Sequence, residues 1–480
     1  MITSFIVFLV GFTVIGLLSA RHRKNTTEDY LVAGRSVSPW LTALSSVASN
    51  NSGFMFIGLI GLAYTDGFKA LWLQLGWVMG DLLAWAWVHR RIRTYSGELN
   101  LQSVPALLGT RQDGHAHRPI VIVAAVLTFF FLAGYAAAQL KAGSTTLHVL
   151  FDWDKNLGSV IGAIIVVAYC FAGGLRASIW TDAAQSMVMM AAMLALLGVG
   201  WSLVGSPVAL ADALETADPK LVDPSGDLAF GTLVYVIGFV FGGFAAIGQP
   251  HVVIRSMAID APEGVPKARL IYFAWLIPFS FACIAAGLYA RILMPELTEG
   301  LAPELVEAAA EGALPKMAMT YLPDILIGLT LAGIFAATMS TADSQILACS
   351  AAITQDLVPG LRDNVRASKA ATLVITAIAL VIAVYAQQGV FDLVLLAWAA
   401  LGATIGPVLV VRVFRLPVPS AIGLIMMASG LATVVLWGES PWGGAVYKQL
   451  PGVFVPLALY AGWYAMVGRA QHLGATGAPK

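Results

Sequence analysis

Long runs of apolar residues dominate this chain and recur about thirteen times, separated by short polar segments. A helix needs about 20 mostly apolar residues to cross a bilayer, and most of these runs reach that length. The pattern therefore predicts an all-α polytopic membrane protein with about thirteen transmembrane helices. The predicted spans cover residues 2–20, 39–65, 71–89, 119–147, 157–174, 180–204, 229–249, 270–293, 319–350, 370–387, 390–411, 418–437 and 450–467.

The composition excludes several classes of protein. Of the 480 residues, 59% are hydrophobic and 11% charged, with a mean hydropathy of +0.81, against about 45–50% and about 25% in soluble domains. A soluble fold could not bury this much apolar surface, which excludes a water-soluble enzyme. The net charge of zero offers no basic excess to phosphates, so no nucleic-acid partner is expected. The three cysteines lie inside apolar runs and suggest neither disulfides nor a zinc site.

The basic residues indicate the orientation in the membrane. The first apolar run lacks preceding basic residues and is followed by Arg21, Arg23 and Lys24, so we expect a retained helix and not a cleaved signal peptide. With the N-terminus outside, most Lys and Arg residues, Arg176 and Arg255 among them, fall in cytoplasmic segments, as the positive-inside rule requires. We expect a multi-pass protein of the cell (inner) membrane, with a cytoplasmic C-terminus and no required oligomer.

The second span contains an unusual polar stretch. From Ser45 to Gly53 every residue except Val47 is small or an amide, and Asn50 and Asn51 are adjacent. These residue types compete with the helix for backbone hydrogen bonds. The stretch predicts a broken helix whose free carbonyl groups could hold a cation and an anionic group of a substrate. Close packing of helices through small residues is the alternative interpretation.

The seventh span carries a second set of helix-weakening residues. Gly242 and Gly243 lie near its middle, and Gln249-Pro250-His251 ends it. Two interrupted spans five helices apart are typical of transporters built from an inverted repeat. Taken alone, the glycines favour close packing over a binding site; together with the second span, the two interpretations are about equal.

The ninth span places oxygen ligands on one helical face. Ala337, Ser340, Thr341 and Ser344 follow the i, i+3, i+4, i+7 pattern, and Asp343 flanks them. Hydroxyl and carbonyl oxygens suit a small hard cation such as sodium. Serine and threonine can also bond to their own helix, but a carboxylate inside the membrane implies a cation, a proton or a basic partner.

Several short motifs resemble the sodium/solute symporter family, and most closely its sodium/proline branch. They include Asp29-Tyr-Leu-Val-Ala-Gly-Arg35, Ser49-Asn-Asn-Ser-Gly53, Ala172-Gly-Gly-Leu-Arg-Ala-Ser-Ile-Trp-Thr-Asp182, Gly248-Gln-Pro-His251, Ala337-Thr-Met-Ser-Thr341 and Ser350-Ala-Ala-Ile-Thr-Gln-Asp356. The resemblance implies a leucine-transporter-like core with a five-plus-five inverted repeat. Within one transmembrane domain, residues 1–37 would form the first helix and loop, 38–204 the first repeat, 205–412 the second repeat, and 413–480 the last two helices and tail.

The resemblance also implies site residues. The sodium ligands would be the carbonyl groups of Ala48, Asn51 and Ala337 with the hydroxyl groups of Ser340 and Thr341. A possible second ion site would involve Asp182, Ser340, Asp343 and Ser344. The substrate-binding residues would be Asn50, Ser52, Gly53, Phe54, Gly242, Ala246 and Gln139.

The chain departs from the proline carriers at the substrate site. Those carriers have an aspartate where this chain has Asn50, and their pocket aromatics appear here as Phe54, Gly242 and Ala246. We therefore expect a sodium-coupled symporter, not an enzyme, that imports a small amino acid such as proline or a related small carboxylate by alternating access. The alternatives are a proton-coupled carrier that uses Asp182 and Asp343, and a transporter-like sensor of substrate.

Overall fold

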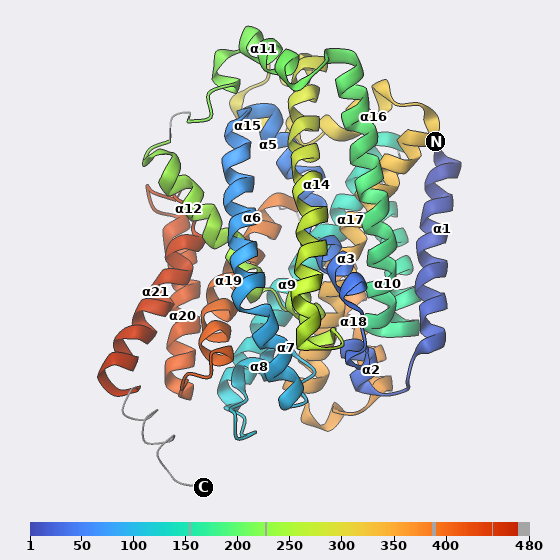
Figure 1. Ribbon diagram of the computed structural model, residues 1–480. Coiled ribbons are helices and arrows are strands. Elements are labelled where there is room, and N and C mark those ends of the chain that lie inside the picture. Colours follow the sequence, from blue (N-terminus) through green and yellow to red (C-terminus); the bar gives the residue numbers. More distant parts are fainter. Residues whose placement is uncertain (152, 155, 226–227, 386–389, 444, 469–480) are drawn as a thin grey trace.

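The computed structural model describes residues 1–480 apart from 152, 155, 226–227, 386–389, 444 and 469–480, and it is a bundle of helices (Figure 1). Two ends of the bundle carry short helices. One end carries α11 (Pro207–Ala217), α15 (Pro303–Ala310) and α16 (Ala313–Tyr321), and we call it the α15 end. The opposite end carries α2 (Thr27–Val32), α7 (His89–Glu98) and α8 (Val104–Gly109), and we call it the α8 end.

The prediction of an all-α fold is confirmed. The described residues form no β-sheet, and β-type pairing is limited there to two isolated bridges, Val37 with Ile259 and Thr110 with Ala116. The remaining α-helices are α1 (Ile2–Ser19), α3 (Pro39–Asn50), α4 (Gly53–Phe56), α5 (Gly58–Asp66), α6 (Lys69–Trp87), α9 (Arg118–Phe151), α10 (Leu157–Val204), α12 (Gly231–Phe244), α13 (Pro250–Ala258), α14 (Val265–Leu293), α17 (Asp324–Ala351), α18 (Val365–Tyr385), α19 (Val390–Val413), α20 (Ser420–Gly438) and α21 (Gln449–Trp463).

The predicted spans can be traced onto these helices. In the described part of the chain, ten helices are long and apolar enough to cross a membrane. One of them, α10, contains both the fifth and the sixth predicted spans. The second predicted span corresponds to the broken segment α3–α5, and the third to α6. The boundaries of the two sequence repeats stay a prediction.

The second span is broken as its polar stretch predicts. Helix α3 begins at Pro39, with the Ser38 hydroxyl group accepting a hydrogen bond from the Leu41 amide, and ends at Asn50. The backbone then leaves the helical path at Asn51 (φ −94°, ψ 75°) and Ser52 (φ −66°, ψ −175°). Asparagine and serine favour such a break because their side chains replace the lost backbone hydrogen bonds.

The seventh span is interrupted later than its glycine pair suggested. Gly242 and Gly243 are helical, and the interruption is a short 3₁₀ segment, Ala245–Gly248, followed by extended Gln249. The cause is Pro250, which has no N–H group and restricts the residue before it. Gly243 serves close packing instead, since a Cβ atom there would lie 1.9 Å from the Trp77 carbonyl oxygen.

The fifth and sixth spans join without a loop. A straight helix of 48 residues would be about 72 Å long, more than twice the bilayer core of about 30 Å, so α10 must change direction. It does so at Gly174, whose backbone is non-helical (φ 57°, ψ −142°). A Cβ atom at this glycine would lie 2.3 Å from the Tyr30 carbonyl oxygen, so both the conformation and the contact require glycine.

Helix α17 runs through the interior of the bundle. All its residues from Thr330 to Ala351 are buried, and it packs against α1, α3, α9 and α10. Every polar group on such a helix must find a partner inside the protein. The Ser and Thr side chains of α17 therefore define where ligands or neighbouring helices meet it.

Candidate functional site

The end of α3 meets the middle of α17 in a buried cluster of oxygen atoms. The Ser340 hydroxyl oxygen lies 3.1 Å from the carbonyl oxygens of both Ala48 and Ala337. The Thr341 hydroxyl oxygen lies 3.2 Å from the carbonyl oxygen of Ser49 and 3.1 Å from that of Ala337. All five residues are at most 1% exposed. The structure thus brings four of the predicted sodium ligands together and adds the Ser49 carbonyl group.

The oxygen atoms of this cluster could coordinate a hard cation if the distances between them increased slightly. Oxygen ligands of calcium lie at about 2.3–2.6 Å, so two ligands at a right angle are about 3.3–3.7 Å apart. The hydroxyl–carbonyl distances here are only slightly shorter. Without an ion, the hydroxyl groups donate to the carbonyl groups; with an ion, both kinds of oxygen could point their lone pairs at it.

The other residues of the break are held by side chains around it. Asn51 donates from its amide to the Val47 carbonyl oxygen at 2.8 Å and so caps α3. The Gly53 amide donates to Gln139 Oε1 at 3.2 Å, and the Tyr135 hydroxyl donates to Ser52 Oγ at 3.4 Å. Gln139 therefore reaches the break from α9, and its Nε2 atom is buried without a partner.

The predicted second ion site forms a network of two carboxylates. Asp182 Oδ2 accepts from Ser45 at 2.6 Å, and Asp343 accepts from Tyr169 at 2.6 Å and from Ser344 at 2.8 Å. The Ser344 hydroxyl oxygen lies 2.5 Å from the Ser340 carbonyl oxygen, which connects this network to the first cluster. Both acids are fully buried.

Arg255 lies in the centre of this network. Its guanidinium group donates to Asp182 Oδ2 at 3.2 Å, to Ser45 at 3.2 Å and to Ser178 at 3.1 Å, and it also contacts Ser344. The side chain is fully buried. The charge pattern counted Arg255 among the basic residues of the cytoplasmic segments, and the structure buries its side chain inside the bundle. The feature of the sequence that could have indicated the burial of Arg255 is its position one turn after His251, on a helix that Pro250 starts inside the bundle.

The predicted substrate residues do not all share one pocket. Phe54 lines a pocket, while Asn50 donates from its amide to the Tyr272 hydroxyl oxygen at 2.6 Å. Gly242 does not line that pocket but lies close to its lining residues Tyr447 and Trp77. Its carbonyl oxygen accepts from Trp398 Nε1 at 3.1 Å. Ala246 is fully buried in the 3₁₀ segment and is not among the residues that line the pocket.

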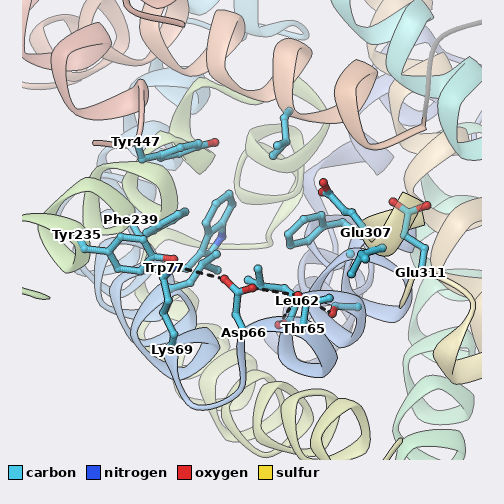
Figure 2. Close-up of a pocket in the computed structure, with 16 residues that line it drawn as sticks. Leu62, Thr65, Asp66, Lys69, Trp77, Tyr235, Phe239, Glu307, Glu311 and Tyr447 are labelled. Atoms are coloured by element: carbon cyan, nitrogen blue, oxygen red, sulfur yellow. Dashed lines mark hydrogen bonds and ion pairs between the residues drawn. The ribbon is translucent and has the colours of Figure 1, made fainter. Parts of the chain in front are cut away.

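The pocket that contains Phe54 belongs to the α15 end of the bundle and has a volume of about 490 Å³. Figure 2 shows the aromatic side chains of Tyr235, Phe239, Trp77 and Tyr447 on one side, Glu307 and Glu311 on the other, and Asp66 beside Lys69. Its lining residues are Phe54, Gly58, Gly61, Leu62, Thr65, Asp66, Lys69, Leu73, Trp77, Tyr235, Phe239, Val306, Glu307, Glu311, Leu395 and Tyr447. The pocket leads from the α15 end toward the break in the second span.

A helix broken at mid-bundle, a cluster of carbonyl and hydroxyl oxygens beside it and a pocket above it define a secondary transporter of the leucine-transporter class. Comparison with a family model agrees, because residues 30–421 match the sodium:solute symporter family. The chain belongs to that family and is a sodium-coupled symporter.

Curated relatives cover almost the whole chain. The sodium/proline symporter of Escherichia coli is 29% identical over 98% of this chain and 93% of its own length. The sodium/proline symporter of Haemophilus influenzae is 30% identical over 95% and 92%, and the high-affinity proline transporter of Bacillus subtilis is 28% identical over 92% of each.

Solved structures share the fold. A Na⁺-coupled sialic acid symporter in a substrate-bound, outward-open state matches with a TM-score of 0.80 at 16% identity over 97% of both chains. A nucleobase-cation-symport-1 family transporter in a closed conformation matches with a TM-score of 0.55 at 15% identity, over 91% of this chain and 95% of that one. The prediction of fold class is confirmed.

Proposed function

We propose that this protein uses a sodium gradient to import a proline-like amino acid across the cell membrane. The observation that carries the proposal is the meeting of the Ser340 and Thr341 hydroxyl groups with the carbonyl groups of the broken α3. A sodium ion bound there would join α3 to α17. The two helices belong to different predicted repeats, so sodium binding would favour one state of the alternating-access cycle.

The proposal assigns the sodium ligands, the position of the substrate and the orientation in the membrane. Sodium would be held by the carbonyl groups of Ala48, Asn51 and Ala337 and by the two hydroxyl groups. Substrate would bind above it, between the break and the pocket at the α15 end. That end would face outward, which agrees with the excess of Lys and Arg residues in the loops of the α8 end. The N-terminus would then lie outside.

The Asp182–Asp343 network would hold a second ion. Two carboxylates and one guanidinium group leave one negative charge without compensation in a buried place, and such a charge requires a proton or a metal cation. The Ser344 bridge to Ser340 supports coupling between the two sites. By linkage, each ligand that favours another's binding is favoured equally in return.

Uptake by the purified protein in proteoliposomes tests the proposal. Radiolabelled L-proline should accumulate under an inward sodium gradient, and gramicidin, which collapses that gradient, should abolish accumulation. A proton gradient in sodium-free buffer is the matched control. Accumulation under the proton gradient alone would overturn sodium coupling in favour of proton coupling, and binding without any flux would favour a sensor.

A further inference from the structure

A buried carboxylate lies on α6 one helical turn after Trp77, which lines the pocket at the α15 end. Asp81 of α6 is 1% exposed, and no ion pair joins it to a basic side chain in the described part of the chain. Its Oδ2 atom accepts from the Tyr272 hydroxyl group at 2.6 Å and lies 3.4 Å from the Asn50 amide nitrogen. A charged acid inside a membrane protein is costly unless a positive group accompanies it.

The lining of the pocket leads to this acid. On α6, Lys69, Leu73 and Trp77 line the pocket at successive i, i+4 positions, and Asp81 is the next position of the same stripe. From the other side, Phe54 lines the pocket and Asn50 lies four residues before it, across the break. Asn50 and Asp81, joined at 3.4 Å, thus lie one step along the chain beyond the lining residues Phe54 and Trp77.

Acceptor atoms outnumber donors at this place. The Tyr272 hydroxyl group accepts one hydrogen bond from Asn50 and donates one to Asp81. The Asn50 Oδ1 atom is buried without a partner. A ligand that brings both a positive charge and N–H donors would satisfy the carboxylate and the amide oxygen together.

The walls of the pocket suit the same ligand. The charged residues of the lining are the acids Asp66, Glu307 and Glu311 and the single base Lys69, which pairs with Asp66 at 3.4 Å. The excess of acid attracts cations toward the pocket. Aromatic rings stand opposite Glu307 and Glu311 (Figure 2). The ring centroids of Phe239 and Tyr447 are 4.8 Å apart, and those of Trp77 and Tyr447 are 6.3 Å apart. Aromatic faces attract organic cations.

We propose that Asp81 is the counter-ion for the protonated amino group of the transported solute, held with Asn50 and Tyr272 next to the lining of the aromatic pocket. This inference rests on the proposed function and narrows it. The substrate would be an amine such as an amino acid, and a plain carboxylate would bind poorly. Asp81 also gives a physical role to Asn50, which presents the acid to the pocket.

A pair of probes that differ at one atom tests the inference. L-Proline and (S)-tetrahydrofuran-2-carboxylate share ring and carboxylate, but the second has oxygen in place of the protonated nitrogen. In saturating sodium, the purified native protein should bind L-proline with at least tenfold higher affinity than the oxygen analogue. In Asp81→Asn, affinity for L-proline should fall at least tenfold and the preference should approach one.

Controls separate this effect from misfolding. Asp212→Asn removes one acid from the exposed surface of α11 and should keep the native preference. The thermal stabilisation by sodium alone reports whether Asp81→Asn is folded. A native protein that binds the two probes equally overturns the inference without any variant, as does an unchanged preference in folded Asp81→Asn. If the native protein binds neither probe in sodium, the proposed substrate class is wrong and the inference falls with it.

Discussion

Removal of the two hydroxyl groups on α17 is the most direct perturbation of the proposed sodium site. Ser340→Ala and Thr341→Ala each delete one oxygen that lies within 3.2 Å of carbonyl groups at the end of α3. In the ion-free protein each hydroxyl group makes a neutral hydrogen bond. In the sodium-bound protein it would contact a charge instead.

The magnitude follows from the difference between these two interactions. A hydrogen bond to a neutral group contributes about 0.5–1.5 kcal/mol and one to a charged group about 1.5–3 kcal/mol. Each deletion should therefore weaken sodium binding by about 1–1.5 kcal/mol, which raises the half-saturating sodium concentration about 5- to 13-fold. The double variant should lose about 30-fold or more if the effects are additive, and less if the two contacts are coupled.

The assay is the sodium dependence of L-proline uptake in proteoliposomes. Thr330→Ala is the matched control, because Thr330 is buried in the same helix and bonds to its own Leu326 carbonyl group at 2.9 Å. Thr341→Ser should retain most of the native affinity because it keeps the hydroxyl group. An unchanged sodium dependence in folded Ser340→Ala/Thr341→Ala would refute the site.

Three further predictions concern other parts of the bundle. Gly174→Ala should lower the melting temperature by several degrees, since backbone strain at such a site costs about 1–3 kcal/mol and the added Cβ atom would clash with Tyr30. Gly198→Ala is the control and should not lower it, because a Cβ atom there has no neighbour within 4 Å. Arg255→Gln should destabilise by about 3–5 kcal/mol, and adding Asp182→Asn should restore part of the loss; a double-mutant cycle with no coupling would contradict this. Asp343→Asn should change the ratio of current to transported solute, and an identical ratio would argue against a second ion.

The local features of the site could be predicted from residue types alone. Asn51 and Ser52 break a helix wherever they occur in such a stretch, because their side chains compete for backbone hydrogen bonds. The hydroxyl face of α17 follows from the helical period, which places Ser340, Thr341 and Ser344 together without reference to any other helix. These properties involve only neighbours in the sequence.

Partners distant in the sequence could not be predicted in the same way. Asn50 contacts Tyr272 and Asp182 contacts Arg255, each pair drawn from different helices. A sequence pattern gives the direction of a side chain on its own helix, but not which neighbouring helix it meets. By its charge, Arg255 was counted with the basic residues of the cytoplasmic segments, whereas the structure buries it beside Asp182.

The sequence by itself determined the class of protein, the spans, the break in the second span and the oxygen-rich face, because a bilayer and a helical period act on each segment separately. Only the tertiary structure decided which acid forms an ion pair with which base, and which acid lies next to the pocket lining. Those choices depend on helix packing, where glycines such as Gly243 let backbones approach closely. The position of Asp81 against Asn50 and Tyr272 is a consequence of that packing.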